Sequence, residues 1–148
     1  MRPSLAALLA LLLTAPALAH DDAALDAMAT PHGGQMRMAG PYHLELVVGD
    51  GELRVHLTDH ADRPVSSAGV SGNAIVLSGA KSTLALAPAG DHAVAGKGSF
   101  VPTPDMKVVV SLTFPDGKAW QARFTPGARV TQAPAATPGT GGTHQHGH

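Results

Sequence analysis

A strict alternation of apolar and polar residues, beginning at Tyr42, constrains the fold of this 148-residue chain more than any other feature. Apolar residues occupy every second position over 42–48 and again over 53–57, which is the pattern of half-buried β-strands. Asp50-Gly51 separates the two runs and favours a tight hairpin turn, because both residues tolerate positive φ. That turn predicts a register with all the apolar side chains on one face: Leu46 opposite Val55, Leu44 opposite Leu57 and Glu45 opposite His56.

Further strands are predicted at 73–77, 82–87 and 92–95, between turns that contain Gly and Pro. A second hairpin joins 107–114 to 119–125 around Pro115-Asp116-Gly117-Lys118. We expect a three-residue Asp-Gly-Lys loop there. This loop would pair Phe114 with Trp120, Leu112 with Ala122 and Val110 with Phe124, and would gather the only Trp and two of the three Phe into one cluster.

The strand pattern predicts an all-β chain, in the form of a small antiparallel immunoglobulin-like β-sandwich with flexible N- and C-terminal tails. A small barrel is the alternative. No stretch shows a helical period over the length that a helix needs. We expect a signal peptide over 1–19, a flexible segment over 20–40, the sandwich domain over 41–126 and a disordered Gly/Thr/Pro/His tail over 127–148.

The first nineteen residues have the three parts of a secretory signal: Arg2, the apolar run 5–13, and Ala17-Leu18-Ala19 as a cleavage site. The apolar run is shorter than the roughly 20 residues of a membrane span. We therefore expect cleavage after Ala19, no stable membrane insertion of the mature chain, and a periplasmic location.

Composition excludes several classes of function. The chain has no cysteine, so thiolate ligands, disulfides and cysteine nucleophiles are absent. The formal net charge is −1 at pH 7, and the basic residues are not clustered, which argues against nucleic-acid binding. No hydrolase, phosphate-loop, zinc-protease or dinucleotide-binding motif occurs, and we expect no enzymatic activity.

Nine histidines are the strongest functional signal, since the chain has only one Tyr and one Trp. Neutral imidazole is a common ligand of copper, zinc and nickel. Three of the nine end the chain, as His144, His146 and His148, in a short tract of the kind that binds metal. His20 would become the first mature residue, where the free amine and the imidazole favour Cu(II).

The first hairpin carries another group of metal-ligand residues. Its register sets Glu45 opposite His56, with His43 diagonal to His56 on the same outward face. Two imidazoles and a carboxylate at this spacing suit a divalent ion, and an ordinary cross-strand Glu–His pair is the alternative. His60 follows the second strand and lies near enough in sequence to join. His32 with Met36 and Met38 would suit Cu(I), although methionine is more often a packing residue.

Several of these segments resemble a small exported domain associated with bacterial heavy-metal efflux systems, similar to a module of periplasmic adaptor subunits. The resemblance covers about 32–125 and rests on four segments: His32-Gly-Gly, Gly40-Pro-Tyr-His-Leu-Glu-Leu-Val, Leu57-Thr-Asp-His, and 106–112 followed by 121–124. It implies metal handling in the periplasm, with His32, His43, Glu45 and His60 as the matching polar positions.

A weaker likeness is to the periplasmic copper-resistance sandwich proteins, which begin with a ligand histidine and use a later Asp-x-His. His20 matches that family, whereas Asp91-His92 lacks the spacer residue. Together these patterns predict a protein that buffers or delivers a transition-metal ion, copper first and zinc, nickel or cobalt next, in metal resistance. The alternatives are an interaction module that docks on an efflux adaptor or another envelope protein, and a copper enzyme centred on His20.

Overall fold

The computed structural model describes residues 19–127, and side chains from Asp22 onward. It contains one short helix and eight strands: α1 (Ala19–Ala27), β1 (Gln35–Ala39), β2 (Tyr42–Gly49), β3 (Glu52–Asp59), β4 (Ser71–Ser78), β5 (Ala80–Pro88), β6 (Ala93–Lys97), β7 (Lys107–Thr113) and β8 (Ala119–Phe124). The all-β class that the sequence predicts is confirmed.

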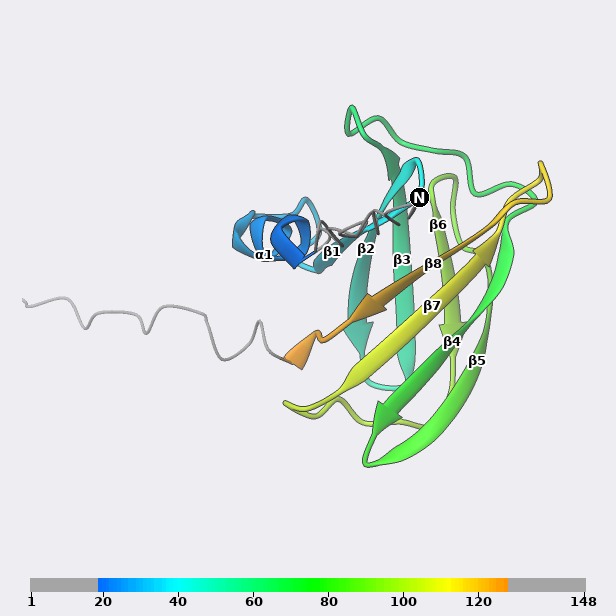
Figure 1. Cartoon of the computed structure of the whole chain (residues 1–148). Coiled ribbons are helices and arrows are strands. Elements are labelled where there is room, and N and C mark those ends of the chain that lie inside the picture. The colour runs from blue at the N-terminus through cyan, green and yellow to red at the C-terminus, as the bar shows by residue number, and fades with distance from the viewer. Residues whose placement is uncertain (1–18, 128–148) are drawn as a thin grey trace, which may run out of the picture.

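The strands form one antiparallel sheet in the order β1-β2-β3-β6-β5-β4-β7-β8. This sheet curves into two layers, with β1, β2, β3 and β6 behind β8, β7, β4 and β5 (Figure 1). The layers are joined narrowly, since β5 and β6 pair at only Ala87 with Ala95 and Pro88 with Val94. The curved sheet is close to a barrel in shape (Figure 1).

The core lies between the layers and is built from the inward-facing apolar residues of the alternating strands. Leu44, Leu53, Val76, Val94 and Leu112 are fully buried within it. The chain has no disulfide to stabilise the fold. Burial of apolar side chains from both layers is therefore the main stabilising contribution.

The β2–β3 hairpin has the predicted register, with Leu46 opposite Val55, Leu44 opposite Leu57 and Glu45 opposite His56. The predicted register of the β7–β8 hairpin is wrong by two residues: Trp120 pairs with Leu112, Ala122 with Val110 and Phe124 with Val108. Pro115 and Asp116 form the centre of a turn closed by the bond from the Gly117 amide to the Phe114 carbonyl. Gly117 then adopts φ 80°, so the loop is Pro-Asp-Gly and not Asp-Gly-Lys.

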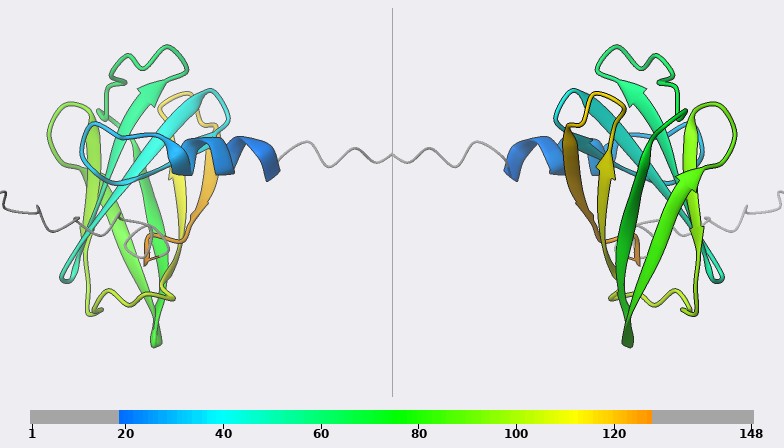
Figure 2. Two further views of the ribbon diagram at one scale, coloured as in Figure 1. Left: turned by 90° about the vertical axis from the view of Figure 1, so that its left-hand side faces the viewer. Right: turned by 90° about the vertical axis from the view of Figure 1, so that its right-hand side faces the viewer.

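Residues 20–40, expected to be flexible, contain α1 and β1, so the expectation of no helix is wrong for residues 19–27. α1 lies beside β1 (Figures 1 and 2). Asp26 makes two short contacts with the Arg37 guanidinium, of 2.8 and 3.1 Å. The side chain of Gln35 donates to Asp26 and accepts from the Thr125 amide. The second bond links the two edge strands, β1 and β8.

Candidate functional site

Five histidines have described side chains, and all lie on or beside β2, β3 and β6. His32 is in the loop before β1, His43 is on β2, His56 is on β3, His60 follows β3 and His92 precedes β6. We call β1, β2, β3 and β6 the histidine half. We call β4, β5, β7 and β8 the plain half, because these four strands carry no histidine and no acidic residue.

The imidazoles form two stacked pairs. The rings of His32 and His56 are nearly parallel, with centroids 3.5 Å apart and an interplanar angle of 2°. The rings of His43 and His60 lie 4.9 Å apart at 17°. Glu45 is opposite His56 as predicted, but His43 belongs to the other pair. The structure therefore divides the predicted His43, Glu45 and His56 group between two clusters.

Glu45 is the most constrained polar group of this face, with 3% of its surface exposed. Its Oε2 accepts from Nδ1 of His32 at 2.7 Å, and its Oε1 accepts from the amides of His32 and Gly34, both at 2.9 Å. Burial by itself raises the pKa of Glu45, and the bonds from His32, Gly34 and Thr30 together outweigh burial and lower that pKa. The carboxylate is therefore ionised and holds His32 in place.

Three histidines each donate from one ring nitrogen, which fixes the tautomer of the neutral ring. His32 donates from Nδ1 to the carboxylate of Glu45. His92 donates from Nδ1 to the carbonyl of Val65 at 3.2 Å, and His60 donates from Nε2 to the carbonyl of Gly40 at 3.0 Å. When one nitrogen of a neutral imidazole donates, the other carries a lone pair that can bind a metal.

His56 is also held in its neutral form. Its partial burial lowers its pKa first, and the adjacent His32 and Arg54 lower it further, against an opposing effect from Glu45. Arg54 is itself engaged with the carbonyl of Ala89 and with Glu52. A neutral imidazole stacked on a second one is ready to accept a cation through nitrogen.

A surface depression of about 340 Å³ opens beside this pair. His92 and Asp91, just before β6, line it together with His32 and His56. The sequence indicated Asp91 and His92 only as an imperfect match to a copper motif. Their position depends on β6 pairing with β3, where Ala93 lies opposite His56, and no local pattern reveals this pairing.

Within residues 19–127, no three His, Asp or Glu side chains converge closely enough to hold one ion as they stand. The structure brings together His32, His56 and Glu45, and separately His43 and His60. In the β1–β2 ladder Met36 lies opposite Glu45, which binds His32, whereas Met38 lies opposite His43. The predicted ligands at His20, His144, His146 and His148 lie outside the described side chains.

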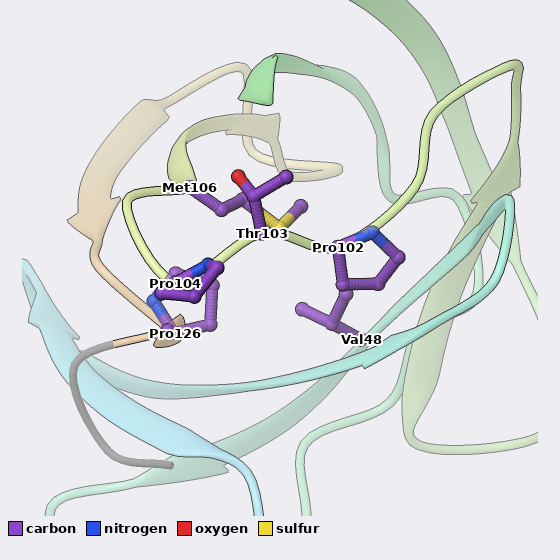
Figure 3. Close-up of a pocket in the computed structure, with 7 residues that line it drawn as sticks. Val48, Pro102, Thr103, Pro104, Met106 and Pro126 are labelled. Carbon is purple, nitrogen blue, oxygen red and sulfur yellow. The ribbon is translucent and has the colours of Figure 1, made fainter. Parts of the chain in front are cut away.

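A second cavity, also of about 340 Å³, lies at the far end of β2 and is mainly apolar (Figure 3). Three proline rings, those of Pro102, Pro104 and Pro126, surround it together with Val48 and Met106. It contains no titratable side chain among its lining residues. Its chemistry suits apolar contact and not coordination or acid–base catalysis.

Comparison of the chain with protein-family models, with curated proteins and with solved structures found no match. In the part of the chain that the structure covers, no helix has both the length and the apolar character needed to cross a bilayer.

Proposed function

We propose that this chain is a non-enzymatic, periplasmic transition-metal-binding protein that buffers or delivers ions in heavy-metal resistance. The stacked pair of His32 and His56 beside the depression is the observation that carries the proposal. Ligand nitrogens lie about 2.0–2.1 Å from an ion such as Zn²⁺, so two nitrogens on one ion are at most about 4 Å apart. The centroids of the two rings are 3.5 Å apart and their planes nearly parallel, and because imidazole lone pairs lie in the ring plane, the rings would tilt toward each other to share one ion.

The surroundings of His32 support a ligand role. Metal-binding imidazoles usually donate their second nitrogen to a carboxylate or a backbone carbonyl, which fixes the tautomer and the ring orientation. Glu45 supplies such an acceptor to His32, and the Val65 carbonyl supplies one to His92. Glu45 therefore acts as a positioning residue and not as a third ligand.

Copper is the first choice of metal, because nitrogen-rich sites follow the Irving–Williams order and bind Cu(II) most strongly, with zinc, nickel and cobalt behind it. Two imidazoles leave the other coordination positions to solvent, to Asp91 or His92 after a small movement, or to the terminal histidines. An ion held by few protein ligands exchanges readily. Exchange is what a buffering or delivery protein requires.

Isothermal titration with Cu(II) tests the proposal on the mature chain. One variant has His20, His144, His146 and His148 all replaced by Ala, and a second adds His32→Ala and His56→Ala. We expect sub-micromolar binding to survive in the first variant and to be lost in the second. Loss of all binding in the first variant would contradict the proposal, because the terminal histidines alone would then explain metal uptake.

The apolar cavity favours a second candidate function, docking on an efflux adaptor or another envelope protein (Figure 3). Val101, 69% exposed, adds apolar surface next to Pro102. This function does not need metal. Surface plasmon resonance against a purified adaptor, with and without EDTA, separates the two candidates, since docking alone predicts equal affinity in both conditions.

We also infer an immunoglobulin-like sandwich as the finer description of this near-barrel sheet. The narrow join between β5 and β6 supports it, because two residue pairs connect the layers there whereas β2 and β3 share eight. Hydrogen exchange of the β5 and β6 amides tests this description. A join between two sheets predicts faster exchange at Ala87 and Ala95 than in the middle of β2.

A further inference from the structure

The second stacked pair, His43 and His60, lies at the other end of β2 from the apolar cavity. His43 is the second residue of β2, and His60 directly follows β3. Asp59 holds the turn after β3 by accepting from the amides of Ala61 and Arg63, at 2.8 and 3.0 Å. His60 is therefore placed by a well-bonded turn, and its Nε2 donates to the Gly40 carbonyl.

His43 has an unexplained buried nitrogen. Its Nδ1 is shielded from solvent and has no hydrogen-bond partner, and the side chain is 15% exposed. The nearest acidic atom is Oδ1 of Asp62 at 3.4 Å, on a residue that is 77% exposed. A buried polar atom without a partner in a folded protein calls for an explanation such as a bound ion or water.

A thioether lies on the same face as these imidazoles. Met38 pairs directly with His43 across the β1–β2 ladder, so the two side chains point to the same side. Met38 is 39% exposed, unlike Met36, of which 7% is exposed. An exposed methionine beside an unpartnered imidazole nitrogen is uncommon as packing, because the sulfur contributes little to the core from there.

We propose that Met38, His43 and His60 form a second metal site, selective for Cu(I) and separate from the pair of His32 and His56. Thioether ligands select soft Cu(I), whereas a site with only imidazole and carboxylate groups favours divalent ions. Nδ1 of His43 makes no hydrogen bond and lies 3.4 Å from the Asp62 carboxylate, and in the neutral His60 ring Nδ1 carries a lone pair because Nε2 donates. The chain would then hold copper in either oxidation state, at two neighbouring positions of one face.

Methionine-methyl NMR of the full mature chain, labelled with ¹³C at the methyl groups, tests this site directly. Anaerobic addition of one equivalent of Cu(I), and separately of the redox-inert mimic Ag(I), should shift the Met38 signal. Met28 is 52% exposed and directly follows α1, outside the strands that carry the proposed ligands, so its signal is the internal control. Unchanged Met38, or equal shifts of Met28 and Met38, would overturn the proposal.

Competition with the chromogenic chelator bicinchoninate supplies the affinity. Met38→Leu and His60→Gln should each weaken Cu(I) binding about tenfold or more, since even outer-shell losses cost about 10–100-fold at metal sites. Leu keeps the volume of Met, and Gln keeps a donor for the Gly40 carbonyl, so both variants should fold. Met28→Leu is the matched control, and an equal loss in it would contradict the assignment.

This inference stands or falls independently of the proposed function at His32 and His56. The Cu(II) titration depends on His32→Ala and His56→Ala, and the Cu(I) experiments depend on Met38→Leu and His60→Gln. A chain that binds Cu(II) normally but shows no Met38 response would retain the first site and lose the second.

Discussion

The two halves of the molecule bury the same kind of core and differ on the outside. In the histidine half, the outward positions of β2 and β3 include His43, Glu45 and His56, and loops add His32 and His60. In the plain half, a typical outward pair is Ser111 and Gln121, joined by one exposed hydrogen bond of 3.0 Å. Since the plain half forms its strands without imidazole or carboxylate, the fold does not require these groups.

The halves also differ in how their polar groups are held. Glu45 is almost fully buried and accepts three hydrogen bonds from His32 and Gly34, which belong to one loop. Gln121 is exposed and makes a single bond to Ser111. Burying an ionised carboxylate is costly unless it is fully hydrogen-bonded, so this arrangement points to a positioning role for Glu45.

The largest expected effect is on metal affinity. Replacing both His32 and His56 with Ala should weaken Cu(II) binding about 100-fold or more in a background without the terminal histidines, since both proposed ligands are lost and one outer-shell loss already costs about 10–100-fold. The matched double variant in the plain half, Ser111→Ala with Gln121→Ala, should bind as the parent does. Equal losses in the two double variants, measured by isothermal titration, would remove the distinction between the halves.

A graft tests whether positioning matters. Ser111→His with Gln121→His builds a cross-strand imidazole pair on the plain half, without a partner such as Glu45. In a background with His32→Ala and His56→Ala, we expect the grafted pair to bind Cu(II) about tenfold or more weakly than the natural pair, because no acceptor fixes its tautomers. Equal affinity would show that a pair of histidines suffices and that Glu45 is unimportant.

Stability should respond to Glu45 more than to Gln121. Glu45→Gln places an amide donor or a weaker acceptor against the His32 imidazole, and disrupting a buried bond to a charged group costs about 1–3 kcal/mol. Gln121→Ala, on the exposed surface, should change the free energy of unfolding by at most about 0.5 kcal/mol. Urea denaturation of both variants in EDTA measures the two changes in unfolding free energy. A larger loss in Gln121→Ala than in Glu45→Gln would contradict the positioning role of Glu45.

The smallest effect is on the pH dependence of stability. Because the pKa of His56 is lowered from its ordinary 6.5, the unfolded chain takes up a proton near that pH before the folded chain does. This contribution to stability is present above pH 6.5 and is lost as pH falls through the lowered value. In EDTA, the urea midpoint should decrease less between pH 7.5 and 5.5 in His56→Gln than in the parent. An equal decrease in both would mean that another group causes the pH dependence.

Sequence reasoning worked where the pattern was local. The alternation on either side of Asp50-Gly51 determined the register of β2 and β3 correctly, because a two-residue turn leaves no freedom in the pairing. In the second hairpin the turn included Pro115 as well as Asp116 and Gly117, and choosing the wrong three loop residues shifted the register by two. An even shift keeps every side chain on its proper face, so the core residues were still predicted correctly.

The features that the sequence could not predict depend on contacts between distant segments. In β1 the polar Gln35 and Arg37 are buried, and Asp26 and Thr125 satisfy them together with Asp22 and the carbonyl of Met36. Likewise His32 reaches Glu45 and His56 through the loop before β1, and His92 reaches the same depression through the pairing of β6 with β3. The histidines were predicted as ligands, whereas their division into two pairs was not.

Long-range ¹H–¹⁵N correlation spectra of the imidazole nitrogens, recorded while the full mature chain is titrated with diamagnetic Zn(II), test the central claim most directly. We predict that ring nitrogens of both His32 and His56 shift together, with a change that saturates at one equivalent, and that Nδ1 of His32 keeps its proton toward Glu45. Shifts confined to His20, His144, His146 and His148 would show that the folded face does not bind metal.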